Sequence, residues 1–583
     1  MIVRMLTLLG FLLSPLIVAQ VGIGTTTPQG ALDVVGANDT GLVIPRVSSI
    51  ENVTDGNGGT PVNGTMVYDI SRGTTCFYSN NRWLCVGNDA SGTPVLSDQT
   101  PVPYSSLGTY FKASNTEASD RFGLAVSMSN DGNTLVFGAS QEDSNATGIN
   151  GSESNNDTFN SGAAYVFSRS SGTWSQQAYI KASNTGISDF FGDVVSLSGD
   201  GNTLAVGVSA EDSNATGING DQTNNLASSS GAVYVFTRSG STWSQQAYIK
   251  ASNTEGNDNF GIDVYLSNDG NTLAVGANSE DSNATGVNGD QANNSASASG
   301  AAYVFTRSGT TWSQQAYIKA SNTQASDLFG SHVALSGDGD TLAVGARNED
   351  SNATGINGDQ TNNTASDSGA VYVYTRSGTV WTQQAYLKAS NTEGTDRFGS
   401  SVALDGSGDI LAVGATGEDS NARGVNGDES NNSASSSGAV YVFTRSGTTW
   451  SQNAYVKASN ADTNDAYGTS VHVSDNGSAI AVGSNGEASN ATGLNGDESN
   501  NTASSAGAAY VYFRSGSTWI KDAYVKPTNT DPGDVFARNV VLSTDGFIFA
   551  GSSWREDSNA TGIGGDPTNN SAADSGAGYL YEN

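Results

Sequence analysis

One polar stretch carries the residue types of a calcium-binding loop. Asp212, Asn214 and Thr216 stand at alternate positions, and Gly217 follows them. A calcium loop places oxygen ligands at positions 1, 3 and 5 and a glycine at position 6. The nearby carboxylates of Glu211 and Asp221 would add ligands, but the bidentate glutamate of position 12 is missing. The spacing therefore leaves two interpretations open: a calcium site, or Asx turns that hold a polar loop together.

The same pattern recurs along the chain. The candidate calcium ligands are Asp143, Asn145, Thr147, Asp212, Asn214, Thr216, Asp281, Asn283, Thr285, Asp350, Asn352, Thr354, Asp557, Asn559 and Thr561. Two further copies are incomplete, with Ala488 at the first ligand position of one and Arg423 at the fifth position of the other. Calcium is the one cofactor for which the sequence offers a ligand pattern.

Groups suited to acid–base or nucleophilic catalysis are scarce. The chain has two histidines, His332 and His472, which belong to no repeated motif, and we interpret them as strand residues. The sequence contains no phosphate-binding loop, zinc motif or Ser-His-Asp set. We therefore predict no catalytic residues and no enzyme activity. A hydrolase that acts on polysaccharide through two carboxylates is the less favoured alternative.

The two cysteines stand in the segment CFYSNNRWLC. If Asn80 and Asn81 form a two-residue hairpin turn, Cys76 lies opposite Cys85 in a non-hydrogen-bonded pair. The Cβ atoms of such a pair are within reach of a disulfide. We predict a disulfide between Cys76 and Cys85, and the alternative is a pair of buried thiols.

The elements that must position these residues repeat every 69 residues. The period is marked by a Phe-Gly pair or its variant, at 122, 191, 260, 329, 398, 467 and 536. One period holds four strand candidates, which in the second copy read DVVSLS, TLAVGV, GAVYVFTR and WSQQAYIKA. Two successive hairpins predict a four-stranded blade, and the third strand is apolar on both faces, as expected between stacked sheets. We assign the Phe-Gly positions to packing between blades.

The ends of the repeat region indicate a closed ring. The seventh copy stops after its third strand, and TYFKASN at 109–115 matches the fourth strand of another copy, AYIKASN at 178–184. An N-terminal strand that completes the last blade is the way in which a propeller closes. The sequence thus predicts an all-β fold, a seven-bladed β-propeller over residues 101–583.

These motifs resemble a known family. The Phe-Gly pair, Gly276-Ala277 and the segment SGAVYVF are similar to the FG-GAP repeat of integrin α-subunit propellers and their bacterial secreted relatives. The resemblance covers residues 101–583 and implies an extracellular β-propeller. Members often carry a calcium loop between the first two strands, but only one carboxylate of it, Asp200 in the second copy, is kept here. We interpret this aspartate as a turn residue.

Residues 1–100 differ from the repeats. Residues 1–19 have the apolar run and small final residue of a signal peptide, which predicts a secreted or cell-surface protein. Residues 20–100, with VGIGTTTPQGALDV and GLVIPRV, resemble an N-terminal module of secreted proteins from Bacteroidetes-type bacteria. That resemblance implies an oligomerising or anchoring role, and a small β-rich cap is the alternative.

Charge and loop length restrict the function. A net charge of −33 excludes nucleic acid and anionic membranes as favoured partners, and no later stretch is apolar enough to span a membrane. Each repeat has a connection of about 22 residues between its second and third strands, on the face of the disc that also carries the blade-to-blade connections. We call this face the long-loop face. We predict an extracellular binding or adhesion module that recognises a protein or glycan there, or else a structural surface or fibre component.

Overall fold

The computed structural model describes Tyr104, residues 108–582 and seven strands between residues 21 and 99. The chain divides into two compact units, Met1–Val102 and Pro103–Asn583. The predicted signal peptide, residues 1–19, lies outside the described residues. All regular elements of the described part are β-strands, and nothing in that part is a helix of the length and apolarity needed to cross a membrane.

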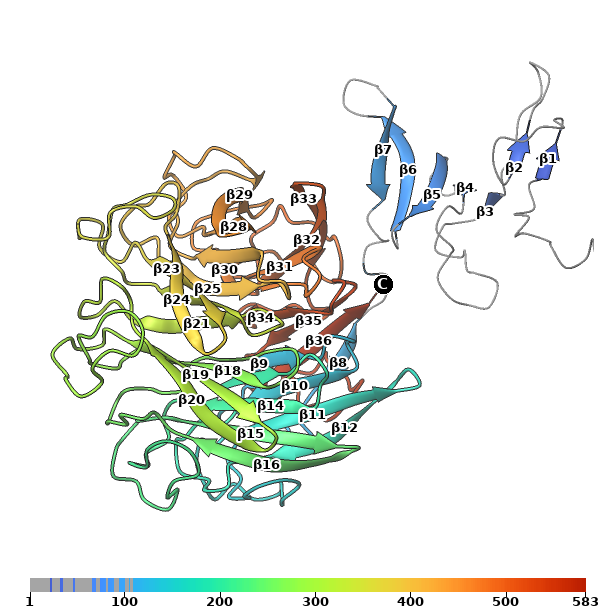
Figure 1. Ribbon diagram of the computed structural model, residues 1–583. Helices are drawn as coiled ribbons and strands as arrows, with labels where there is room; N and C mark the ends of the chain where they lie inside the picture. The colour runs from blue at the N-terminus through green and yellow to red at the C-terminus, as the bar shows by residue number, and fades with distance from the viewer. Residues whose placement is uncertain are drawn as a thin grey trace, which may run out of the picture. The chain divides into compact units, whose positions relative to one another are not determined.

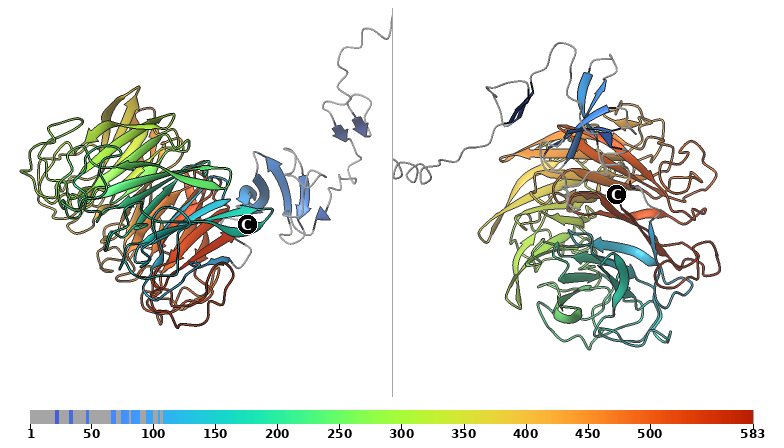
Figure 2. Two further views of the ribbon diagram at one scale, coloured as in Figure 1. Left: turned by 90° about the horizontal axis from the view of Figure 1, so that it is seen from below. Right: turned by 90° about the vertical axis from the view of Figure 1, so that its right-hand side faces the viewer.

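The second unit is a seven-bladed β-propeller, as the repeat predicts. Its sheets follow one another in chain order around a central axis, each with four antiparallel strands, and one sheet has an additional short strand (Figures 1 and 2). The turn between the first two strands is built by the predicted aspartate: Asp200 Oδ1 accepts hydrogen bonds from Ser198 Oγ at 2.6 Å and from the backbone N–H of Asn202 at 2.9 Å. A local Asx turn therefore sets the hairpin.

The strands of the blades are given from the channel outward. The first strands are β9 (Phe122–Met128), β13 (Val194–Leu197), β17 (Val264–Leu266), β21 (Phe329–Leu335), β25 (Phe398–Leu404), β30 (Tyr467–Val473) and β34 (Phe536–Leu542). The second strands are β10 (Thr134–Ala139), β14 (Thr203–Val208), β18 (Thr272–Ala277), β22 (Thr341–Ala346), β26 (Ile410–Ala415), β31 (Ala479–Ser484) and β35 (Ile548–Ser553). The third strands are β11 (Ala163–Ser170), β15 (Ala232–Ser239), β19 (Ala301–Ser308), β23 (Ala370–Ser377), β28 (Ala439–Ser446), β32 (Ala508–Ser515) and β36 (Ala577–Glu582). The fourth strands are β12 (Thr173–Ile180), β16 (Thr242–Ile249), β20 (Thr311–Ile318), β24 (Val380–Leu387), β29 (Thr449–Lys457), β33 (Thr518–Val525) and β8 (Thr109–Phe111), and the additional strand is β27 (Gly424–Val425).

The ring is closed by pairing between the two ends of the repeat region. β36 pairs antiparallel with β8, so that Tyr579 lies opposite Tyr110 and Gly578 opposite Phe111. Phe111 is fully buried and packs at 5.5 Å between ring centroids against Phe137 of the first blade. The predicted closure by an N-terminal strand is therefore confirmed.

The core lies between neighbouring blades. Phe260 of the third Phe-Gly pair is fully buried, clusters with Val233 of the blade before it, and packs 5.2 Å from the ring of Tyr303 in its own blade. The assignment of the Phe-Gly positions to inter-blade packing is confirmed. Gly207 permits the close approach, because a Cβ there would lie 2.2 Å from the carbonyl oxygen of Gly261 in the next blade.

The first unit contains two small sheets. Its strands are β1 (Val21–Ile23), β2 (Leu32–Val34), β3 (Arg46–Val47), β4 (Met66–Asp69), β5 (Thr74–Ser79), β6 (Arg82–Asn88) and β7 (Pro94–Gln99). β1 pairs with β2, and β3 to β7 form one sheet in chain order. β5 and β6 pair with Cys76 opposite Cys85, the register predicted from the two-residue turn, and the Cys76 side chain is buried. The disulfide itself stays a prediction.

Candidate binding site at the central channel

The predicted calcium ligands of the long loops serve the loop backbone. Asp212 Oδ1 accepts a hydrogen bond from the backbone N–H of Ser229 at 2.8 Å, and the Asp212 carbonyl accepts one from Ala227 N–H at 2.8 Å. Asn214 and Thr216 are exposed. Asp212 thus closes the loop across 17 residues of chain through a side chain–backbone hydrogen bond, which is longer in range than the two-residue Asx turn that the sequence suggested.

The other copies follow the same arrangement. The equivalent contacts join Asp143 to Asn160 N–H at 2.6 Å, Asp281 to Ala298 N–H at 2.7 Å, Asp350 to Asp367 N–H at 2.8 Å and Asp557 to Asp574 N–H at 2.8 Å. The exposed partners at the third and fifth positions are Asn145, Thr147, Asn283, Thr285, Asn352, Thr354, Asn559 and Thr561. Within the described residues, no three or more His, Cys, Asp or Glu side chains gather where they would hold a metal ion. The aspartates of these loops therefore hold the loop backbone through long-range hydrogen bonds, and calcium binding stays a prediction.

Glu211, considered above as an added calcium ligand, belongs to a buried network instead. Its Oε2 forms a salt bridge of 2.8 Å with Lys250 Nζ, and both side chains are almost completely buried. Its Oε1 accepts hydrogen bonds from Tyr248 OH at 2.8 Å and from Asn184 Nδ2 at 3.1 Å. Lys250 Nζ also donates to Ser230 Oγ at 2.7 Å. Because its carboxylate is enclosed by these donors, the interpretation of Glu211 as a calcium ligand is wrong.

This Lys–Glu pair occurs in every blade. The other six pairs are Lys112–Glu556, Lys181–Glu142, Lys319–Glu280, Lys388–Glu349, Lys457–Glu418 and Lys526–Glu487, at 2.7–3.0 Å. Burial lowers the pKa of each lysine, and the paired glutamate opposes that shift. The sequence carried a signal for these pairs that our interpretation missed: a glutamate and a lysine separated by 39 residues in six of the seven copies.

The long loops lie along the outer strand of their own blade. In the second blade, Lys250 N–H donates to Gly217 O at 2.8 Å and Asn219 N–H donates to Tyr248 O at 2.7 Å. In the fifth blade the same segment is regular enough to form β27, which pairs with β29. These loops are therefore built into the blades, and their repeated residues act in architecture.

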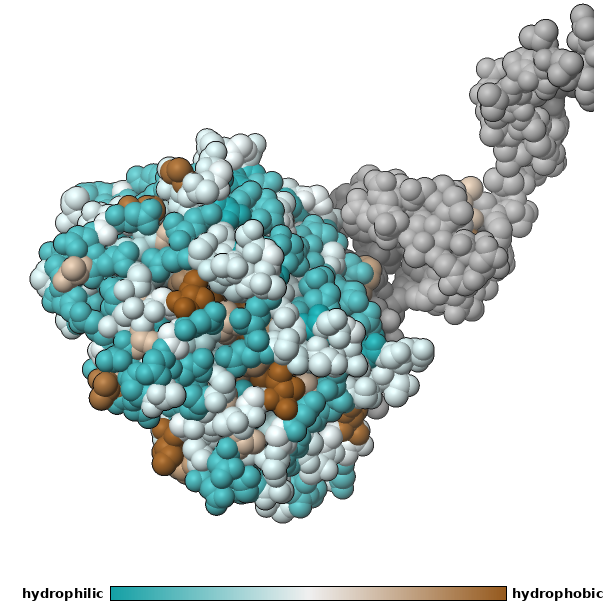
Figure 3. All heavy atoms as spheres, turned by 60° about the horizontal axis from the view of Figure 1, so that its bottom comes forward, coloured by the Kyte–Doolittle hydropathy of each residue, from teal (hydrophilic) through white to brown (hydrophobic). Residues whose placement is uncertain are grey.

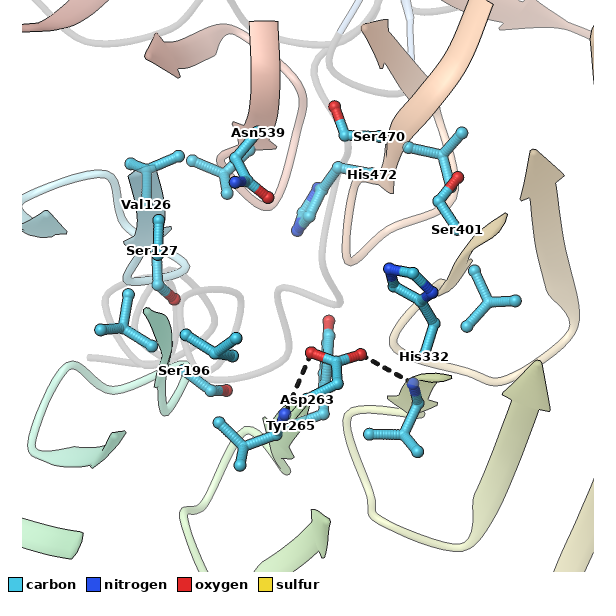
Figure 4. Close-up of a pocket in the computed structure, with 18 of the residues that line it drawn as sticks. Val126, Ser127, Ser196, Asp263, Tyr265, His332, Ser401, Ser470, His472 and Asn539 are labelled. Atoms are coloured by element: carbon cyan, nitrogen blue, oxygen red, sulfur yellow. Dashed lines mark hydrogen bonds between the residues drawn. The ribbon is translucent and has the colours of Figure 1, made fainter. Parts of the chain in front are cut away.

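The residues that differ from blade to blade face the central channel. The first strands line a cavity of about 380 Å³ along the axis, and Figure 4 shows their side chains pointing into it. One position is a valine in all seven blades: Val126, Val195, Val264, Val333, Val402, Val471 and Val540. The preceding position differs in nearly every blade: Ala125, Val194, Asp263, His332, Ser401, Ser470 and Asn539. A repeat that varies at one inward position offers an asymmetric, polar cavity to a ligand.

Both histidines of the chain line this cavity. His332 and His472 lie on β21 and β30, as predicted for strand residues, and their rings point into the channel (Figure 4). Burial lowers the pKa of both imidazoles to about 4, and for His332 Arg347 and Arg538 add to this shift, so both histidines are neutral at pH 7. His472 Nδ1 accepts a hydrogen bond from Leu542 N–H at 3.3 Å. Sequence reasoning could not find this cavity, because its position depends on which strand of the blade is innermost.

An aspartate also faces the channel. Asp263 Oδ1 accepts a hydrogen bond from its neighbour Val264 N–H at 3.0 Å, and Oδ2 accepts one from Val333 N–H in the next blade at 2.8 Å (Figure 4). Burial raises the pKa of this carboxyl to about 7. Asp263 therefore joins the inner strands of the third and fourth blades. Between the second and third blades, Ser196 Oγ accepts a hydrogen bond from Leu266 N–H.

Comparison with known families assigns the repeats. The FG-GAP repeat model matches residues 110–167, 174–236, 243–305, 312–374 and 381–443, more than half of the chain. The chain belongs to the FG-GAP repeat family. The predicted resemblance is thus confirmed, and this FG-GAP propeller extends the repeat over two further blades that keep the 69-residue period.

Other comparisons concern the N-terminal region and the fold. Residues 22–98 match the family described as a phage tail like trimerisation region. No curated protein shows significant similarity to this FG-GAP propeller. Among solved structures it is similar to a crystal structure from Bacteroides uniformis, provisionally described as a 6-phosphogluconolactonase, at 10% identity and a TM-score of 0.39. The alignment covers 78% of this chain and 92% of that chain. A similarity this distant carries no information on function.

Proposed function

We propose that the protein is a secreted or cell-surface binding module that recognises a protein or glycan at the long-loop face of its propeller. The observation that carries this proposal is the contrast between repeated and varied positions. Long-loop residues such as Asp212 recur in six of the seven blades, whereas channel residues such as Asp263 and His332 occur once. A purely structural ring has no need of inner surfaces that differ from blade to blade, but a binding cavity does.

Two exposed apolar side chains on the long-loop face support the same proposal. Phe159 and Ile187 are 62% and 69% exposed, and they lie close together because Ser188 N–H donates to Phe159 O at 2.9 Å. Other blades carry Ser or Ala in place of Phe159. In the view of Figure 3 the propeller surface is mostly hydrophilic, with scattered apolar residues. Apolar side chains at this site suit contact with a partner.

We further propose that residues 22–98 assemble three copies of the chain. The support is the match of this region to a trimerisation family. Three propellers in one assembly would bind a multivalent surface more tightly than one, since later contacts form at a high effective concentration. The same match also supports the alternative of a structural surface component, in which the trimer is the whole function.

We propose binding without catalysis. The support is that Asp263, a carboxyl of raised pKa in the cavity, uses both oxygens to accept backbone hydrogen bonds. A general acid needs to reach the bond it protonates. Release of reducing sugar from a panel of polysaccharides would overturn this part of the proposal.

The test is binding of the full secreted chain to glycan and extracellular-protein arrays. We expect binding that is lost when the cavity is altered, as in Leu124→Trp with Ile262→Trp at two half-buried lining positions, while the melting temperature is kept. A matched control is Thr449→Trp, at the start of β29, where the chain is exposed. Absence of binding by a folded trimer would favour the structural component instead.

A further inference from the structure

Four arginines break the repeat at the long-loop end of the channel. Arg121 and Arg397 stand just before the Phe-Gly pairs of the first and fifth blades. Arg347 follows the second strand of the fourth blade, and Arg538 is the third residue of the inner strand of the seventh. In the other blades the equivalent positions carry uncharged residues, except for Asp193. We call these four arginines the channel-mouth arginines. They concentrate positive charge at one site on a chain of net charge −33.

The channel-mouth arginines lie near one another and near the cavity. Arg347 and Arg538 line the cavity, and the positive charges of both act on His332. Arg397 is close enough to Arg347 to lower its pKa further, next to the larger effect of burial. Arg121 and Arg538 both face Asp193, and Arg121 stacks 4.7 Å from the Trp554 ring. Two of these charges thus line the cavity, and the other two act on groups beside them.

These cations form no salt bridge in the described part of the chain, although the carboxylate of Asp193 acts on Arg121 and Arg538 and that of Asp367 on Arg347. Arg121 Nε is buried without any hydrogen bond. His332 Nδ1, also buried, has no hydrogen-bond partner. By contrast, Arg376, whose position carries an arginine in other copies of the repeat as well, forms a salt bridge of 2.7 Å with Asp340. Unpaired donors around a cavity are the arrangement expected before an anion binds.

The remaining lining suits a sugar. Hydroxyl and amide groups line the cavity between the charges, from Ser331, Thr469, Ser470, Asn278 and Asn539. The three hydroxyls and the Asn539 amide N–H donate to backbone carbonyls, so their oxygens are the atoms left to accept hydrogen bonds from a ligand. Such groups hydrogen-bond ring hydroxyls, while a guanidinium holds a carboxylate through two parallel bonds. The cavity of about 380 Å³ is at the small end of ligand sites, which favours one or two sugar rings. A long polyanion is disfavoured because the acidic surface around the mouth would repel it.

We propose that the channel mouth binds the carboxylate of an acidic sugar, free or at the end of a glycan chain. This inference rests on the proposed function and names its ligand class. In the proposed complex, Arg347 and Arg538 hold the carboxylate, and the serine, threonine and asparagine side chains bind the ring hydroxyls.

The test is isothermal titration of the full chain with glucuronate, glucose and acetate. We expect glucuronate to bind at least about tenfold more tightly than glucose or acetate, since only glucuronate offers both the charge and the hydroxyls. Arg347→Ala and Arg538→Ala should each weaken glucuronate binding about tenfold or more. The matched control is Arg423→Ala, which removes the same charge from an exposed loop position where Arg423 lies 3.8 Å from Asp462.

Each outcome bears on the inference. Equal affinity for glucuronate and glucose would overturn the inference. So would an equal loss of glucuronate affinity in Arg423→Ala and in the Arg347→Ala and Arg538→Ala variants, at an unchanged melting temperature. If an oligosaccharide with a terminal uronate binds more tightly than the free sugar, the glycan end is the ligand; the reverse order identifies the free sugar acid. Binding of a neutral glycan or a protein on the arrays, with no glucuronate binding, would overturn this inference and leave the proposed function standing.

Discussion

The outer part of each blade and the channel mouth use charge in opposite ways. In the blades, Lys250 and Glu211 are buried together at 2.8 Å, surrounded by hydrogen-bond partners, and their equivalents recur in all seven copies. At the channel mouth, Arg347 and Arg538 occur once each and form no salt bridge among the described residues. A paired charge that repeats belongs to the architecture, whereas an unpaired charge that does not repeat is available to a ligand.

This difference follows from the cost of burying charge. An enclosed ion pair is tolerated only when its geometry and remaining hydrogen bonds are nearly complete, so every blade must carry the same surrounding residues. The channel-mouth arginines have no such repeated set of partners, and their positions differ from blade to blade. The predictions below test this contrast between repeated and varied positions, in order of decreasing expected effect.

The largest effect is expected from opening the ring. Deletion of residues 101–115 removes β8, which leaves β36 with an unpaired edge and Glu556 without Lys112. We expect loss of cooperative melting and aggregation, measured by calorimetry and light scattering. A deletion of equal length in the other unit, residues 86–100, is the control and should leave the propeller transition in place. An unchanged transition in the first variant would show that closure contributes little.

Breaking one buried pair should have the next largest effect. Glu211→Ala leaves the Lys250 ammonium uncompensated in the core and should cost about 3–5 kcal/mol in the free energy of unfolding, measured by chemical denaturation. The matched control is the double variant Glu211→Met with Lys250→Met, which removes both charges and should cost much less. If single and double variants lose the same stability, the pair is not the repeated structural unit we infer.

Sequence reasoning reached the architecture but not the site, and particular residues show why. Phe260 could be placed between blades because a fixed 69-residue period carries its packing role into every copy. Ring closure through residues 109–111 followed from matching TYFKASN with AYIKASN. Lys250 and Glu211 were missed as partners because they are far apart in sequence and an acidic residue in a polar loop suggested a metal. His332 lay on the predicted strand, but its role depends on which strand lines the axis.

A pH dependence should arise from a second repeated group. Asp120, Asp189, Asp258, Asp327, Asp396, Asp465 and Asp534 precede the Phe-Gly pairs, and burial, with nearby carboxylates, raises the pKa of each to about 7 or 8. Because the folded pKa lies above the unfolded value, the stability contributed by the protonated form is complete below about pH 4 and is lost as pH rises to about 7–8.

The measurement compares melting temperatures from pH 5 to 8. Changing Asp189, Asp258 and Asp327 together to Asn keeps the acceptor oxygen for contacts such as that from Glu255 N–H to Asp258 Oδ2 at 3.0 Å, and removes the ionisation. We expect the triple variant to lose less stability than the parent over this range. As a control, Asp221→Asn changes an exposed turn carboxylate and should leave the parent's pH profile intact. If melting temperature depends on pH in the same way in the parent and the triple variant, these aspartates are not the source of the pH dependence.

The smallest effect is expected in the long loops. Variants there decide whether Asp212 only holds the loop backbone or also binds calcium. Asp212→Ala removes the hydrogen bond from Ser229 N–H and should lower the free energy of unfolding by about 1 kcal/mol. If this contact is the whole role of Asp212, thermal melts in calcium and in chelator at equal ionic strength should coincide for both parent and variant, because no ion then favours the folded state. A calcium-specific rise that shrinks when Asp212, Asp281 and Asp350 are changed together to Ala would instead mean that the repeated loops bind metal. The contrast would then be between two kinds of ligand site, one repeated around the disc and one unique to its centre.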